Sequence, residues 1–111
     1  MAKNTIISQQ IKDKITIFAK LLKESGITVE KIILYGSYAK GHPHEYSDID
    51  LCVISPSFAN EEKYPDYFRQ VWSLADKVDR AFEPIPFSQD DLDNKYSSLS
   101  SEIRKHGVRV L

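Results

Sequence analysis

Asp48 and Asp50 are the side chains in this sequence best placed for chemistry, because they flank Ile49 at the start of an apolar run. Side chains at i and i+2 of a strand lie on one face, about 6.6 Å apart along it. Two such carboxylates can bind one hard cation, or a pair of them. The alternative is a polar strand face in water. Aspartate is depleted in strands and like charges repel, so the pair needs a reason and a metal site is a candidate, with the solvated face left open at this point.

A second feature lies about a dozen residues earlier, where an apolar segment ends at Gly36 and Ser37. Glycine lets the backbone approach a ligand closely, and free N–H groups at the start of a following helix attract phosphate oxygens. Ser37 adds a hydroxyl group at the same point. Strand–Gly–Ser turns are common, so this feature predicts a phosphate site only together with the two aspartates.

The rest of the sequence must position these groups. Apolar residues at helical spacing predict a first helix from about residue 7 to Gly26, and strands are predicted over residues 29–35 and 48–54. Pro65 fits the first turn of a helix to residue 78, with an inward face of Phe68, Val71, Trp72 and Ala75.

Residues 81–87 predict a third strand, which Pro84 and Pro86 restrict to an edge or to a short length. A capping box at Ser88 opens a short helix, and another helical turn covers residues 102–106 before Gly107. The tail adds a last strand or packs against the core. This order predicts an α/β or α+β fold, with a small mixed sheet, in a single domain over residues 1–111.

Together, GSYAKG at positions 36–41 and SDIDL at positions 47–51 resemble the signature of the polymerase-β-like nucleotidyltransferase superfamily. Within it the chain looks most like the minimal nucleotidyltransferases, the MNT family. The resemblance implies that Gly36 and Ser37 hold nucleotide phosphates, with Lys40 where the family commonly has arginine. It implies that Asp48 and Asp50 bind catalytic Mg²⁺, with two ions expected.

The resemblance also implies a third carboxylate on a later strand, as a metal ligand and as the base for an attacking hydroxyl. Asp79 and Glu83 are both candidates; they lie four residues apart, so strand parity does not separate them. Glu83 lies inside the predicted strand, in a Phe-Glu-Pro stretch similar to the Ile-Glu-Pro of some small members. Asp79 lies at a helix–strand junction, where a solvated acid is expected. Glu83 is therefore favoured.

The resemblance implies transfer of a nucleoside monophosphate (NMP), AMP from ATP or another NTP, to a hydroxyl acceptor. A 111-residue chain has no room for an acceptor-binding domain, so a second chain is expected. In the family this is often a HEPN-domain toxin, modified on a tyrosine. The alternatives are a non-catalytic module that neutralises a partner, and an aminoglycoside-type adenylyltransferase acting as a homodimer.

Composition further limits the classes of protein to which this chain can belong. Fifteen Lys and Arg against 16 Asp and Glu leave a net charge of −1, which argues against sequence-independent nucleic-acid binding. Cys52 is the sole cysteine, which excludes an intramolecular disulfide. No apolar run approaches the roughly 20 residues of a membrane span. The first ten residues lack the apolar block of a signal peptide, so a cytoplasmic protein without a membrane partner is expected.

Overall fold

The computed structural model describes residues 7–39 and 48–111. At its centre is a four-stranded sheet in the order β3-β2-β1-β4. β1 (Lys31–Tyr35) pairs antiparallel with β2 (Ile49–Ile54) and with β4 (Val108–Arg109), whereas β2 pairs parallel with β3 (Phe82–Phe87). The small mixed sheet of the sequence prediction is confirmed, and the tail supplies its last strand.

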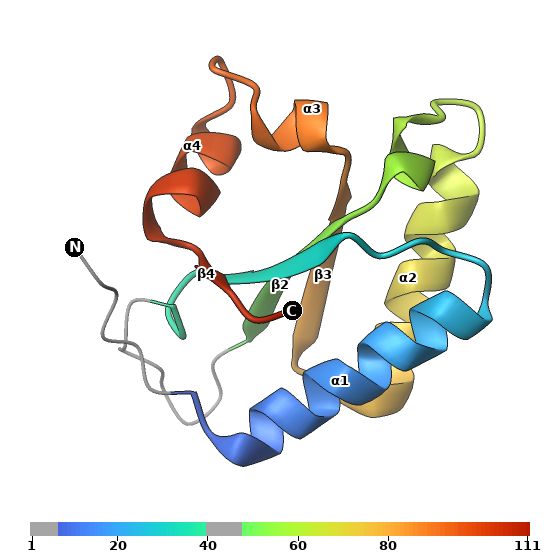
Figure 1. The fold of residues 1–111 in the computed structure, drawn as a ribbon, viewed down its shortest axis with the longest axis vertical. Coiled ribbons are helices and arrows are strands. Elements are labelled where there is room, and N and C mark those ends of the chain that lie inside the picture. The colour runs from blue at the N-terminus through green and yellow to red at the C-terminus, as the bar shows by residue number, and fades with distance from the viewer. Residues whose placement is uncertain (1–6, 40–47) are drawn as a thin grey trace.

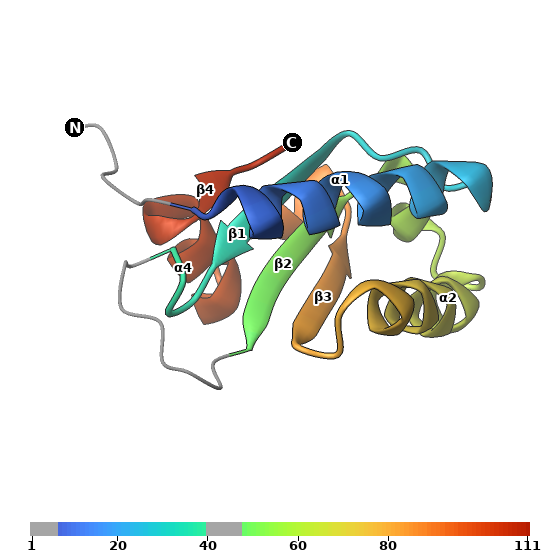
Figure 2. The ribbon, with the colours of Figure 1, turned by 90° about the horizontal axis from the view of Figure 1, so that it is seen from below.

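Helices cover both faces of this sheet (Figure 1). α1 (Gln9–Glu24) and α2 (Tyr64–Val78) pack on one face, around a core that includes Phe18, Leu51 and Val71. α3 (Gln89–Leu92) and α4 (Ser98–His106) cover the other face, where Cys52, Leu92 and Ile103 are buried. Seen from below, α1 lies across the strands and α2 lies beside β3 (Figure 2). The fold is therefore α+β, with two separate layers of apolar packing.

The ends of the helices follow local rules of capping. The side chain of Ser8 caps α1 by accepting a hydrogen bond from the Ile11 N–H at 3.2 Å, and Gly26, at φ +94°, follows the helix as predicted. The predicted capping box between Ser88 and Asp91 is present at α3. α4 begins at Ser98, four residues before the predicted helical turn, because Ser97 caps it.

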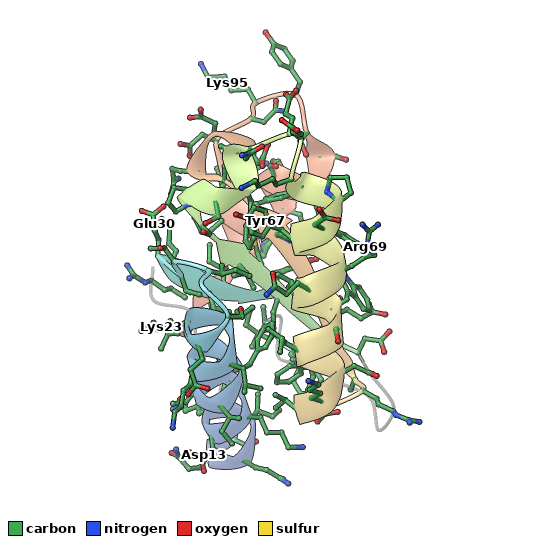
Figure 3. All side chains as sticks on the ribbon, turned by 90° about the vertical axis from the view of Figure 1, so that its right-hand side faces the viewer. Asp13, Lys23, Glu30, Tyr67, Arg69 and Lys95 are labelled. Carbon is green, nitrogen blue, oxygen red and sulfur yellow. The ribbon has the colours of Figure 1, made fainter. Side chains whose placement is uncertain are left out.

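The prediction of which α2 side chains face the core is partly wrong. Val71 and Ala75 are buried, but Phe68 and Trp72 keep 39% and 37% of their surface exposed. Positions four apart advance by about 40° around a helix, so the stripe through Tyr64, Phe68 and Trp72 turns away from the core. Its rings contact one another instead, with centroids 6.2 and 6.1 Å apart. Figure 3 shows α1 and α2 side by side, with Arg69 of α2 pointing away from the sheet.

β3 forms an edge of the sheet, as its prolines predicted. The N–H groups of Ile49 and Ser55 donate to the carbonyls of Ala81 and Phe87, at 2.7 and 3.0 Å. Alternation along a strand then points the backbone nitrogens of Pro84 and Pro86 away from β2, toward the free edge. The prolines therefore interrupt no ladder hydrogen bond.

Among residues 7–39 and 48–111, no helix combines the length and the apolar character needed to span a bilayer.

Candidate active site

Three side chains from three strands form one row at an end of the sheet. Tyr35 of β1 pairs in register with Asp50 of β2, which pairs with Glu83 of β3. Side chains of paired residues lie on the same face of a sheet, with neighbouring strands about 4.8 Å apart. This is the face covered by α3 and α4, whereas Ile49 and Leu51 point into the opposite core, as the alternation predicted.

The carboxyl groups of the row influence one another directly. Asp50 and Glu83 share a side-chain hydrogen bond. Burial raises the pKa of Asp50, and the charge of the exposed Asp48 adds to that rise, while the hydrogen bond from Glu83 opposes it. The pKa of Glu83 is raised by burial and then by Asp48 and Asp50. Asp48, Asp50 and Glu83 are therefore neighbours whose charges influence one another.

These groups fit a divalent cation in their chemistry. Hard carboxylate oxygens are the ligands of Mg²⁺, and a cation would offset the burial and the mutual repulsion that raise both pKa values. As the side chains stand within residues 7–39 and 48–111, no three Asp, Glu, His or Cys side chains form a ready-made cage for a metal ion.

Gly36 brings the predicted phosphate turn against the carboxylates. Its φ is +75°, and a Cβ atom at this position would overlap the Oδ2 atom of Asp50. The two features found separately in the sequence are therefore in contact. Residues 36–39 form a turn in which Ser37 is half-buried. Lys40 and the loop histidines, His42 and His44, lie outside the described residues.

Asp79 is engaged elsewhere. Its Oδ2 atom lies 2.7 Å from the Nζ atom of Lys14 on α1, and its Oδ1 atom accepts a hydrogen bond from the Ala81 N–H at 2.8 Å. The hydrogen bond from Lys14 lowers the pKa of Asp79, with burial opposing it. The expectation of a solvated acid is wrong for Asp79. Strand register, which the sequence did not provide, separates the two candidates and places Glu83 beside Asp50.

An Asp79→Asn variant is expected to lose stability but not metal binding. The neutral amide keeps an oxygen for the Ala81 N–H and loses the ion pair with Lys14, which is partly exposed, so the cost is about 1 kcal/mol. Thermal unfolding and Mg²⁺ titration measure the two effects. A Glu83→Gln variant is expected to show the reverse pattern, and metal binding that depends on Asp79 instead would contradict the assignment.

Tyr35 is a site residue that the sequence reasoning missed. It is half-buried, and its pKa is raised by burial first and then by Asp50, Cys52 and Glu83. The phenol therefore stays neutral beside the carboxylates. Its place as the last strand residue before Gly36 was visible in the sequence, but its pairing with Asp50 depends on register.

The raised pKa values predict a pH dependence of stability in the presence of a chelator. The ordinary pKa of Glu83 is 4.5 and its folded value is higher, so its contribution to stability is present below 4.5 and is lost as the pH rises through the folded value. Asp50 acts in the same sense. Asp79 acts oppositely, but only below its ordinary value of 3.8.

The free energy of unfolding is therefore expected to fall as the pH rises above 4.5, and less steeply in Glu83→Gln than in the wild type. Urea titrations at a series of pH values measure both slopes. Equal slopes in the two proteins would show that Glu83 does not titrate abnormally.

Comparisons with known proteins agree with this geometry. The family model described as "Nucleotidyltransferase domain" matches residues 14–109. No curated protein is similar enough to the chain to count as a match.

Solved structures share the fold. One is a toxin–antitoxin crystallised with AMP-PNP, which matches with a TM-score of 0.59 and 23% sequence identity. The match covers 90% of this chain and 72% of that one. Another is a mutant of the toxin–antitoxin MntA–HpeT: TM-score 0.52, 19% identity, with the same coverages. A candidate nucleotidyltransferase from Sulfolobus solfataricus has a TM-score of 0.51 and 17% identity, covering 96% and 89%.

The family model spans most of the chain and includes Gly36, Asp48, Asp50 and Glu83. The resemblance of the motif is confirmed by this match, and the mixed sheet has the fold of solved relatives. The chain belongs to the nucleotidyltransferase domain family.

Proposed function

We propose that this nucleotidyltransferase domain, acting as one minimal unit, transfers AMP from ATP to a hydroxyl group on a protein partner. The observation that carries the proposal is the position of Asp50, which lies between the turn at Gly36 and the carboxyl group of Glu83. Phosphates bound at the turn would therefore lie next to groups able to hold a divalent cation.

Each residue has a proposed role. Gly36 and Ser37 bind the nucleotide phosphates, assisted by Lys40. Asp48, Asp50 and Glu83 would hold two Mg²⁺ ions. When bound, such ions neutralise charge on the phosphates as the transition state forms. The turn and the carboxylates come from different strands of one rigid sheet, so the protein supplies positioning more than covalent chemistry.

The acceptor hydroxyl oxygen forms a bond to the α-phosphorus, the bond from that phosphorus to the bridging oxygen of the β-phosphate breaks, and pyrophosphate leaves. The hydroxyl proton passes to a carboxylate. Glu83 suits this role because burial and the neighbouring carboxylates raise its pKa above the ordinary value, which makes the ionised form a stronger base.

Two structural relatives support a protein acceptor. Both are toxin–antitoxin structures, and one contains AMP-PNP. We propose a tyrosine of a HEPN-type toxin as the acceptor, with activity that depends on this partner. A chain that consumes ATP and carries a buried free thiol at Cys52 suits the cytoplasm, the location we propose.

Calorimetric titration of ATP with Mg²⁺ tests the proposal. The wild type is compared with an Asp48→Asn/Asp50→Asn variant and with a charge-matched Asp13→Asn/Asp76→Asn control, which changes exposed acids on α1 and α2. We expect Mg²⁺-dependent binding in the wild type and the control, and none in the first variant. The next step is labelled ATP with the partner present.

The main alternative is a non-catalytic module that neutralises a partner by binding alone. The observation that favours it is that no three Asp, Glu, His or Cys side chains form a ready-made metal cage among residues 7–39 and 48–111. Tight binding of the partner by both variants, without Mg²⁺-dependent ATP binding or AMP transfer by the wild type, would support this alternative and overturn the enzymatic proposal. Transfer to an aminoglycoside would support a small-molecule adenylyltransferase.

A further inference from the structure

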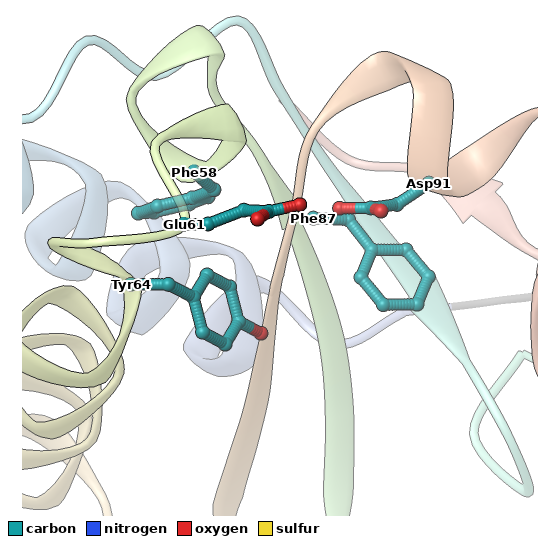
Figure 4. Close-up of a pocket in the computed structure, with 5 residues that line it drawn as sticks. All are labelled: Phe58, Glu61, Tyr64, Phe87 and Asp91. Carbon is teal, nitrogen blue, oxygen red and sulfur yellow. The ribbon is translucent and has the colours of Figure 1, made fainter.

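A second cavity lies at the other end of β3 from Glu83. It has a volume of about 310 Å³ and is lined by Phe58, Glu61, Tyr64, Phe87 and Asp91 (Figure 4). These residues come from the short helix η1 (Pro56–Ala59), the segment entering α2, the end of β3 and α3. Phe87 lies four positions beyond Glu83 along the strand, about 13 Å away, so the cavity is distinct from the candidate active site.

The polar atoms that line this cavity are acceptors. The carboxylates of Glu61 and Asp91 extend toward one another across it (Figure 4). One oxygen of Asp91 accepts a hydrogen bond from the Ser88 N–H at 2.9 Å. The Tyr64 hydroxyl donates its proton to the Pro86 carbonyl at 2.8 Å, so its oxygen faces other groups only as an acceptor.

Glu61 and Asp91 form no ion pair with any lysine or arginine of residues 7–39 and 48–111. Within the described parts of the chain, the ion pairs of lysine and arginine involve Asp66, Asp79 and Glu24. The pKa of Tyr64 is raised by burial and then by the charge of Asp91, which indicates a negative potential at the cavity wall. A ligand must therefore bring positive charge and hydrogen-bond donors.

The remaining walls are aromatic. The rings of Phe58, Tyr64 and Phe87 line the cavity, and Phe58 is held by an edge-to-face contact with Tyr67 at 5.8 Å. Aromatic faces attract cations through their quadrupole and do not coordinate metal ions as oxygens do. An anion would be repelled by the acids, and a neutral apolar molecule would leave them desolvated without partners. Only an organic cation satisfies both kinds of wall.

We propose that this cavity binds the guanidinium or ammonium group of an organic cation. The group would donate to Glu61 and Asp91 while its flat or alkyl surface contacts Tyr64 and Phe87. Two sources share this chemistry: an arginine or lysine side chain on a partner protein, and a free polyamine. The inference does not depend on nucleotide transfer, because the cavity shares no residue with the row of Tyr35, Asp50 and Glu83.

Calorimetric titration and NMR of the aromatic side chains test the proposal. The probes are N-acetyl-arginine amide, the matched uncharged N-acetyl-citrulline amide, and spermidine. The arginine probe is expected to bind with a Kd on the order of 1 mM, as a small ligand in a shallow site should. Tighter binding of spermidine would identify a polyamine as the source, and tighter binding of the arginine probe would identify a protein side chain.

Glu61→Gln is the decisive variant, with Glu62→Gln as its matched control, since both acids are exposed and only Glu61 lines the cavity. We expect Glu61→Gln to weaken binding about five- to tenfold, and Glu62→Gln to leave it unchanged. Equal binding of the arginine and citrulline probes, equal effects of the two variants, or no saturable binding of any probe would each overturn the proposal.

Discussion

An Asp50→Asn variant is expected to lose AMP transfer by roughly 10³-fold or more, because the central one of the proposed metal ligands is removed. The same change is expected to raise the stability of the protein in a chelator. Asp50 is half-buried beside Asp48 and Glu83, and its pKa is raised by burial and by the charge of Asp48. A neutral amide removes that repulsion, and the gain is about 0.5 kcal/mol once solvent screening is allowed for.

Transfer is measured with labelled ATP and the partner protein, and stability is measured by urea unfolding with and without Mg²⁺. Mg²⁺ is expected to stabilise the wild type and to leave Asp50→Asn unaffected. Asp76→Asn, on the exposed side of α2, is the control for loss of one negative charge. A variant that loses activity together with stability would instead mean that Asp50 supports the fold.

A Gly36→Ala variant is expected to lose both stability and Mg²⁺-dependent ATP binding. At φ +75° an alanine is strained, and its Cβ would overlap the Oδ2 atom of Asp50. The strain alone costs about 1–3 kcal/mol, and displacement of the Asp50 side chain should weaken Mg²⁺-dependent ATP binding at least about tenfold. Unfolding curves and calorimetry measure these two effects.

Gly26→Ala is the control that separates backbone strain from steric overlap with Asp50. Gly26 also has a positive φ, +94°, but a Cβ there meets nothing within 4 Å. The control should therefore lose about 1 kcal/mol of stability and keep full ATP binding. Equal loss of binding in both variants would show that contact with Asp50 is unimportant.

Much of the fold could be predicted from local patterns. The first helix and the glycine after it follow from spacing and residue type within a few positions of one another. The edge position of β3 follows from Pro84 and Pro86, since their missing N–H groups restrict where such a strand can lie. The likeness of the Gly–Ser turn and the paired aspartates to one family was also a local feature.

Other features depend on contacts between distant segments, and those the sequence did not provide. Register decides that Glu83, and not Asp79, lies beside Asp50, and it also brings Tyr35 into the row. The ion pair of Lys14 with Asp79 joins residues 65 positions apart. Trp72 was predicted to be buried from its helical spacing, but the rotation of its stripe about α2 leaves it partly exposed.

The prolines of β3 also bear on how molecules of this protein meet one another. An exposed strand edge normally invites a strand from another molecule to pair with it, which is a route to aggregation. Along the outer side of β3, Pro84 and Pro86 have no N–H to offer, and the N–H of Phe82 is already bonded to the Asp79 carbonyl at 3.0 Å. The outward carbonyl of Pro86 already accepts a hydrogen bond from the Tyr64 hydroxyl. An approaching strand would therefore find few backbone groups to pair with, so this edge disfavours the strand addition that begins aggregation.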